Sequence, residues 1–266
     1  MTTNDRVLLA VEGGVAHVRL NRADKRNGLD RAMFEALIAT GETVAADRRV
    51  RAVVLSGEGP AFCAGLDWKS FLADGEGARA LLARDVTRSP ANVAQRACWV
   101  WTEVPVPVIA AVHGAALGGG LQLALACDMR LIAPDATLSV MEVRYGLVPD
   151  MTASQTLLRL VRPDVAKELM FTGRVMSGED AARIGLATRL SADPLSEAKE
   201  LARAIAAQSP DAIRAAKKLC DRAPGMSVAD ALSLETELQL GLLGTPNQMA
   251  AVQAAMTKKP ARFEDR

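Results

Sequence analysis

The stretch "VPVIAAVHGAALGGGLQLALACDMRLIA", residues 106–133, determines the fold that we predict for this chain. Residues 107–114 form a short apolar run typical of a buried strand, and residues 118–127 open on three glycines and continue as a helix. Residues 129–134, "MRLIAP", are again strand-like. A strand, a helix and a second strand in this order predict βα units with a largely parallel sheet.

The segments before this stretch extend the alternation. Residues 6–22 contain two β-rich runs around Gly13-Gly14 and predict a hairpin. Residues 29–47 have helical spacing of apolar positions, with Asp30 as the N-cap. Residues 51–57, "RAVVLSG", predict a strand buried on both faces. The predicted fold class is therefore α/β.

Beyond about residue 195 the alternation stops. Four amphipathic helices without intervening strands are predicted at residues 196–208, 210–222, 228–243 and 247–259. We predict a core over residues 1–195 and a C-terminal helical region over residues 196–266. This region is either a packing subdomain or a subunit interface, and the pattern alone favours neither.

Composition excludes several classes of partner. Lys plus Arg total 32 against 31 Asp plus Glu, so nothing indicates binding to nucleic acid or to an anionic membrane. Residues 104–127 carry no charge, but Pro105, Pro107 and several glycines divide this run, which excludes a membrane span. The start of the sequence does not resemble a signal peptide, and we expect a cytoplasmic protein.

Metal binding and several common catalytic motifs are also excluded. The four cysteines (Cys63, Cys98, Cys127 and Cys220) form no CxxC pair, and His17 and His113 are the only histidines, so we expect reduced thiols and no metal site. There is neither a P-loop nor a GxSxG motif. Both histidines are interpreted as structural.

Two glycine-containing loops remain as candidates for chemistry, at residues 57–65 and 114–120. Glycine has no Cβ, so the backbone N–H groups of such loops can approach a ligand closely. The second loop also opens a helix, whose free N–H groups favour a developing negative oxygen. One N–H group from each loop would make an oxyanion hole. The alternative is that both loops are simply tight turns.

Six segments together carry a family resemblance: "NRADKRNGLD" (21–30), "GEGPAFCAGLDWK" (57–69), residues 106–133, "MEVRYGLVPD" (141–150), "FTGRVMSGEDAARIGLATRL" (171–190) and "KKPARFEDR" (258–266). With them the chain resembles the crotonase superfamily, the enoyl-CoA hydratase/isomerase group, over nearly its whole length. The resemblance implies a ClpP/crotonase-like spiral of ββα units with a C-terminal helical region. It also implies a homotrimer or a dimer of trimers.

The resemblance further implies an acyl-CoA thioester substrate, whose coenzyme A is part of the substrate, and no separate cofactor. The N–H groups of Leu66 and Gly119 would polarise the thioester carbonyl. Lys25 and Arg26, together with the loop of Ala64, Gly65, Leu66 and Asp67, would line the coenzyme A site beside Gly119. For Lys25 and Arg26 the alternative is a solvated charged turn.

The carboxylates distinguish the reactions of this family. Its hydratases use two glutamates around a water molecule, but here Gln122 stands at the first position and Glu142 at the second. Gln122 can neither take nor give a proton and can only position a water or a carbonyl. Glu142 would therefore be the acid/base. Asp150 matches a catalytic aspartate of the dienoyl-CoA isomerases and is either a helper or a turn residue.

Isomerisation of an enoyl-CoA is the function that we predict. The alternatives are hydration by Glu142 with Asp150, a non-catalytic acyl-CoA binding protein, and a family member with another outcome, such as a thioester hydrolase. Residues 70–101, predicted to be mostly helical, would line the acyl pocket. Of the aromatic residues there, most are expected to pack in the core.

Overall fold

A six-stranded sheet in the order β1-β2-β3-β4-β6-β9 forms the centre of the molecule. The computed structural model describes residues 6–73, 77–84 and 89–265. The first pair is antiparallel and all other neighbours in this sheet are parallel. The strands are β1 (Val7–Glu12), β2 (Val15–Leu20), β3 (Ala52–Gly57), β4 (Val108–Val112), β6 (Met129–Ile132) and β9 (Arg189–Leu190).

A smaller sheet lies against one end of the large one, in the order β5-β7-β8. Its strands are β5 (Ala115–Leu117), β7 (Thr137–Ser139) and β8 (Met176–Ser177). The uncharged run at residues 104–127 is thus divided among β4, β5 and a short helix. Within the described ranges, no helix combines the length and the apolar character that crossing a membrane requires.

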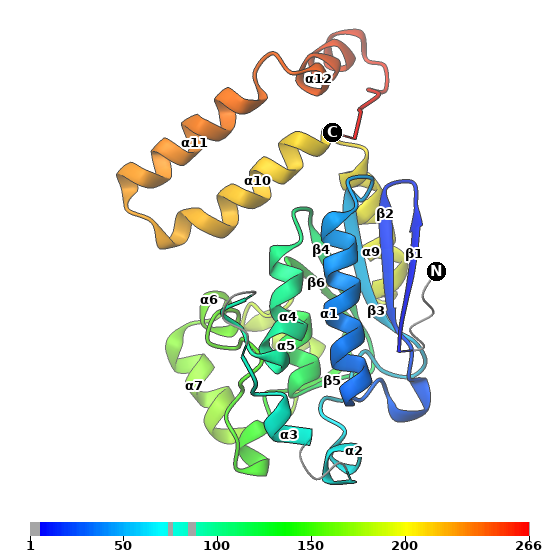
Figure 1. The fold of residues 1–266 in the computed structure, drawn as a ribbon, viewed down its shortest axis with the longest axis vertical. Coiled ribbons are helices and arrows are strands. Elements are labelled where there is room, and N and C mark those ends of the chain that lie inside the picture. The colour runs from blue at the N-terminus through cyan, green and yellow to red at the C-terminus, as the bar shows by residue number, and fades with distance from the viewer. Residues whose placement is uncertain (1–5, 74–76, 85–88, 266) are drawn as a thin grey trace.

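Most helices of the first three quarters of the chain lie over one face of the large sheet or beyond one of its ends (Figure 1). The helices of this part of the chain are α1 (Arg31–Ala46), α2 (Trp68–Ala73), α3 (Gly77–Ala80), α4 (Val93–Glu103), α5 (Gly119–Leu125), α6 (Leu157–Leu160), α7 (Pro163–Thr172) and α8 (Gly178–Arg183), with 3-10 turns η1 (Ala23–Lys25) and η2 (Glu142–Tyr145). The predicted N-cap is confirmed, because the Asp30 carboxylate accepts from the Met33 N–H at 2.9 Å. The hairpin at Gly13-Gly14 is confirmed as well.

Burial on both faces explains the continuous apolar runs of the central strands. In β3, Val53 and Leu55 belong to the core that α1 and α4 cover, whereas Ala52 and Val54 face the other side. Side chains alternate along a strand, so a strand covered on both faces needs apolar residues at every position.

The C-terminal helices are α9 (Pro194–Ala206), α10 (Pro210–Arg222), α11 (Val228–Leu242) and α12 (Pro246–Thr257), with η3 (Ala223–Gly225) after α10. Helix α9 packs on the second face of the large sheet through Ala198, Ala202 and Ala206. Helices α10 and α11 extend away from the core as an antiparallel pair (Figure 1). The packing therefore places α9 with the core, and the three later helices form the projecting part.

Candidate active site

A cavity of about 240 Å³ brings together the residues that the sequence singled out. It lies between the loop after β3, the glycine-rich segment before α5 and the η2 segment. Its walls are formed by Phe34, Ala64, Gly65, Leu66, Trp68, Leu81, Leu82, Ala94, Leu117, Gly118, Gly119, Met141, Glu142, Tyr145, Leu147, Asp150 and Met151. All four predicted catalytic positions, Leu66, Gly119, Glu142 and Asp150, line this one cavity.

Backbone hydrogen bonds hold the two glycine-containing loops together. The Cys63 N–H donates to the Ala115 oxygen at 2.9 Å, and the Leu117 N–H donates to the Cys63 oxygen at 3.0 Å. Gly65 has a φ of +84°, and a Cβ at this residue would lie 2.5 Å from the Leu117 oxygen. Only glycine fits both the left-handed backbone and this close approach. Because hydrogen bonds join the two loops, they are not two unrelated tight turns.

Two N–H groups at this junction are unused. No hydrogen bond among the described residues involves the N–H of Leu66 or that of Gly119. Their chain neighbours are engaged, since Asp67 donates to the Leu29 oxygen at 3.0 Å and Gly118 donates to the Ser139 oxygen at 2.9 Å. Free donors beside a cavity are a suitable place for a carbonyl oxygen that gains charge.

Glu142 begins the η2 segment and approaches the glycine-rich segment closely. Gly118 has a φ of +50°, and a Cβ at this residue would lie 3.3 Å from the Glu142 Oε1 atom. The Glu142 Oε2 atom is buried and has no hydrogen-bond partner among the described residues. Burial raises the pKa of Glu142, the nearby charge of Asp150 adds to the rise, and hydrogen bonds to the carboxylate oppose it.

Gln122 is completely buried on α5 and contacts Glu142 directly. Its Nε2 atom donates to Glu142 Oε1 at 2.6 Å. Its Oε1 atom accepts from the N–H groups of Met151 at 2.8 Å and Ala153 at 3.2 Å. The sequence predicted that Gln122 would position a water or a carbonyl, whereas in the structure its amide binds Glu142 and the loop after Asp150.

That loop is strained at Thr152, which has a φ of +80°. A β-branched residue in this region costs about 1–3 kcal/mol, and such strain persists only where the surroundings enforce it. Here the bend directs the N–H groups before and after Thr152 onto one oxygen of Gln122. Nothing in the sequence indicated this conformation, because threonine is not a residue that favours it.

Asp150 lines the cavity near Glu142, and the residue taken as a whole is exposed to solvent. Partial desolvation of its carboxyl group raises its pKa. A second carboxyl group with a raised pKa in the same cavity is available for proton transfer. Its role as a helper remains a prediction.

The residues predicted to bind coenzyme A lie partly beside the cavity and partly away from it. The Ala64 N–H donates to the Arg26 oxygen at 2.9 Å, so the turn with Lys25 and Arg26 adjoins the loop after β3 that contains Leu66. Both basic side chains are exposed and line no wall of the cavity. The Asp67 carboxylate binds the Arg22 guanidinium at 2.7 Å and the hydroxyl of Ser70 at 2.8 Å. Arg22 was not identified from the sequence, which gives no sign of this ion pair.

Of the four aromatic residues near the predicted acyl pocket, Phe71 and Trp101 are buried in the core, whereas Trp99 is half-buried outside it. Trp68 lines the cavity and packs against Tyr145, with ring centroids 5.2 Å apart. Tyr145 was not singled out from the sequence. Of the predicted segment 70–101, residues 74–76 and 85–88 lie outside the described residues.

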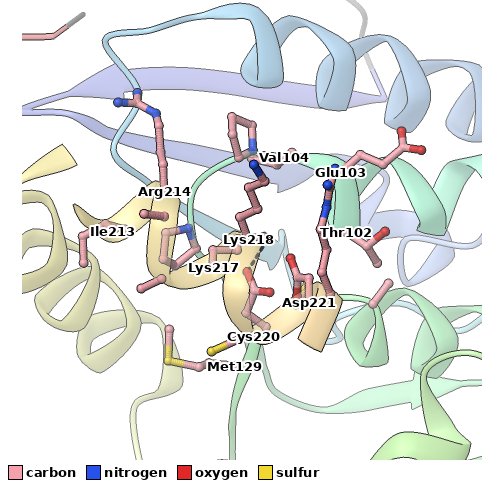
Figure 2. A pocket seen from close by; sticks show the side chains of 18 of the residues that line it. Thr102, Glu103, Val104, Met129, Ile213, Arg214, Lys217, Lys218, Cys220 and Asp221 are labelled. Atoms are coloured by element: carbon pink, nitrogen blue, oxygen red, sulfur yellow. Dashed lines mark hydrogen bonds and ion pairs between the residues drawn. The ribbon is translucent and has the colours of Figure 1, made fainter. Parts of the chain in front are cut away.

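A larger hollow of about 1270 Å³ lies between α10 and the ends of α4 and α5. Figure 2 shows the side chains of Lys217, Lys218 and Asp221 along its wall. The Lys217 ammonium binds the Asp128 carboxylate at 2.6 Å and thereby joins α10 to the core. Neither Glu142 nor Gly119 borders this hollow, so it is separate from the candidate active site.

A family model described as enoyl-CoA hydratase/isomerase matches residues 10–266. The chain belongs to the enoyl-CoA hydratase/isomerase family. It is similar to the Delta(3,5)-Delta(2,4)-dienoyl-CoA isomerase, mitochondrial, of Rattus norvegicus, with 34% identity over 93% of this chain and 78% of the relative. It is also similar to the mitochondrial methylglutaconyl-CoA hydratase of Mus musculus, with 30% identity over 94% of this chain and 80% of the relative.

Solved structures of the family have the same fold. The crystal structure of an enoyl-CoA hydratase from Bacillus anthracis matches with a TM-score of 0.86 and 30% identity, over 98% of this chain and 100% of that chain. The predicted crotonase fold is therefore confirmed. As a member of this enoyl-CoA hydratase/isomerase family the protein is an enzyme that acts on CoA thioesters.

Proposed function

We propose that this enzyme isomerises an enoyl-CoA by moving one proton between carbons of the acyl chain. The observation that carries the proposal is the pairing of Glu142 with the neutral amide of Gln122. Beside this pair lie two N–H groups that have no hydrogen-bond partner among the described residues. Such a pairing offers one acid/base, Glu142, and one place for a negative oxygen. A double-bond shift requires no more than this.

The proposed reaction conserves atoms and electrons. A C–H bond of the acyl chain breaks, its proton goes to Glu142, and the electron pair spreads onto the thioester oxygen as an enolate. The N–H groups of Leu66 and Gly119 stabilise that oxygen in the proposed site. Glu142 then returns the proton to the other end of the conjugated system, and the double bond has moved. We propose that no cofactor takes part besides the coenzyme A of the substrate.

Hydration is the second candidate, favoured by the position of Asp150 in the same cavity and by its raised pKa. In this reaction one of the two carboxyl groups, Glu142 or Asp150, would activate a water molecule, and the other would protonate the acyl chain. The named relatives include both an isomerase and a hydratase, so similarity supports both candidates.

The test is incubation of the purified protein with a 3-enoyl-CoA or a 2-enoyl-CoA in D₂O, followed by mass spectrometry. Double-bond migration or deuterium incorporation without added water is the expected result. Addition of water would establish hydration instead. Free CoA thiol would indicate a thioester hydrolase, and saturable binding without any exchange would indicate a non-catalytic binding protein.

The pH dependence of the isomerisation follows from Glu142. Because burial raises the pKa of Glu142, its ionised form, which accepts the proton, is present only at a correspondingly higher pH. We expect the rate to increase with pH through a midpoint above the ordinary glutamate value of about 4.3. Measurement of kcat across pH 4–8 checks this, and a midpoint at or below the ordinary value contradicts the assignment.

Replacement of Gln122 by glutamate tests whether the absence of a carboxyl group at residue 122 limits the rate of hydration. The Gln122→Glu variant restores a second carboxyl group next to Glu142, and we expect faster hydration of crotonyl-CoA than in the wild type. No gain would mean that water placement or pocket shape limits hydration. An added Asp150→Asn substitution, measured in the same assay, reports whether Asp150 contributes.

The family resemblance also supports proposals for the coenzyme A contacts, the oligomeric state and the localisation. We propose that Lys25 and Arg26 bind the phosphates of coenzyme A, since their turn is hydrogen-bonded to the loop that contains Leu66 and both side chains are exposed. Helices α11 and α12 expose apolar side chains such as Leu232, Leu240 and Met256, which suits packing in a homotrimer or a dimer of trimers. We propose a cytoplasmic enzyme.

A further inference from the structure

We infer that Gln122 is a positioning residue for Glu142: its amide donates to one carboxylate oxygen, fixes the orientation of the carboxyl group and stabilises its ionised form. The inference rests on the proposed proton transfer by Glu142 and adds a role for a residue that contacts no reacting atom.

The orientation of the Gln122 amide is determined by its neighbours. Two backbone N–H groups, those of Met151 and Ala153, lie against one end of the side chain. An amide NH₂ group cannot accept from them, so this end is the oxygen. The NH₂ group must then face Glu142. The assignment of the two ends therefore follows from the backbone donors.

The loop that supplies these donors is built around the Gln122 oxygen. The left-handed conformation of Thr152 turns the chain so that the N–H groups on both sides of this residue converge. Gln122 itself is completely buried and lies on α5 within the core. The side chain is thus held by the core around its aliphatic part and by two N–H groups at its oxygen. Its NH₂ group therefore points toward Glu142.

The consequence for Glu142 concerns its two oxygens. Oε1 accepts from the NH₂ group at 2.6 Å, and a proton on Oε1 would point at that donor. Oε2 has no partner among the described residues and is shielded from solvent. The contact with Gln122 therefore fixes the orientation of the Glu142 carboxyl group through Oε1. The same hydrogen bond stabilises the ionised form, so it also keeps the pKa of Glu142 from rising further.

The experiment replaces Gln122 by methionine, which has a similar length and offers no amide. Loss of the donor to Oε1 removes a stabilising contact from the ionised carboxylate. We expect the midpoint of the acidic limb of kcat to move up by about one pH unit, a shift that corresponds to one hydrogen bond to a charged group. We also expect kcat at its plateau to fall about tenfold or more, because Glu142 is no longer held in one orientation.

A direct titration of Glu142 separates this inference from the proposed function. The infrared carboxyl band that disappears in the Glu142→Gln variant reports the protonation of this residue without any turnover. We expect its midpoint to move up in Gln122→Met by the same amount as the kinetic limb. This measurement decides the inference even if the wild type isomerises no enoyl-CoA.

Leu125→Met is the matched control, because Leu125 is buried on the same helix and borders the other hollow. Its midpoint should equal that of the wild type. If Gln122→Met does not fold, Gln122→Glu replaces it. There the two carboxyl groups share one proton and titrate in two steps, the upper one above the wild-type midpoint. A midpoint unchanged in Gln122→Met, or a single step at the wild-type value in Gln122→Glu, overturns the inference.

Discussion

Glu142→Gln is expected to lower kcat for double-bond migration by about 10²–10⁴-fold, the usual contribution of a general acid/base. Glutamine has the same shape as glutamate, and its oxygen can still accept from the Gln122 amide. The substitution therefore removes the proton carrier and little else. We expect the Kd for an acyl-CoA to change by no more than a few fold, which separates loss of chemistry from loss of binding.

The stability of this variant provides an internal check. Burial raises the pKa of Glu142, so the charged form opposes folding at neutral pH, and any stabilisation from this group is present only at acidic pH. We therefore expect the Tm of Glu142→Gln at pH 7 to be at least that of the wild type. Glu200→Gln, on the exposed side of α9, is the control and should keep full activity. Retained turnover in Glu142→Gln would show that another group is the base.

Gly65→Ala is expected to reduce kcat/KM by about 10²–10³-fold, as removal of one oxyanion donor typically does. The added Cβ would lie 2.5 Å from the Leu117 oxygen, a backbone atom that cannot rotate away. The two loops must then separate, and the N–H groups of Leu66 and Gly119 no longer converge. Kinetic assays on purified variant protein measure the effect.

Gly13→Ala is a matched control for this substitution. Gly13 has a φ of +57° at the hairpin turn, and a Cβ there would meet no atom within 4 Å. Both variants place alanine in the left-handed region, at a cost of about 1–2 kcal/mol, but only one separates the loops. We expect Gly13→Ala to lose stability and keep its kcat/KM. Equal activity of the two variants would show that the close approach of the loops is not needed.

Much of the fold was predictable because its signals are local. The hairpin at residues 6–22, the Asp30 cap and the apolar runs of β3 and β4 each depend on neighbouring residues in the chain. The convergence of Leu66, Gly119, Glu142 and Asp150 on one cavity was foreseen only through family resemblance. Spacing alone left the glycine loops open to a second interpretation.

Other features depend on contacts between distant segments and could not be predicted. The amide oxygen of Gln122 accepts hydrogen bonds from a loop about thirty residues later in the chain. This loop is strained at Thr152, and threonine is not a residue type that predicts a left-handed conformation. The loop that includes Asp67 is predicted to line the coenzyme A site, but no sequence signal indicated that the Asp67 carboxylate also forms an ion pair with Arg22. In each case a long-range partner determines what the side chain does.

The proposed use of main-chain donors at Leu66 and Gly119 has a consequence for the evolution of this enzyme. Side chains change by mutation, but every residue except proline retains its N–H group, so carbonyl polarisation survives most substitutions at Leu66. The outcome of the reaction then depends on a few carboxylate positions. Codons for glutamine and glutamate differ by one base, so a single point mutation at residue 122 is enough to place a further carboxyl group beside Glu142. A change of reaction through such a mutation would leave the fold and the proposed oxyanion hole intact.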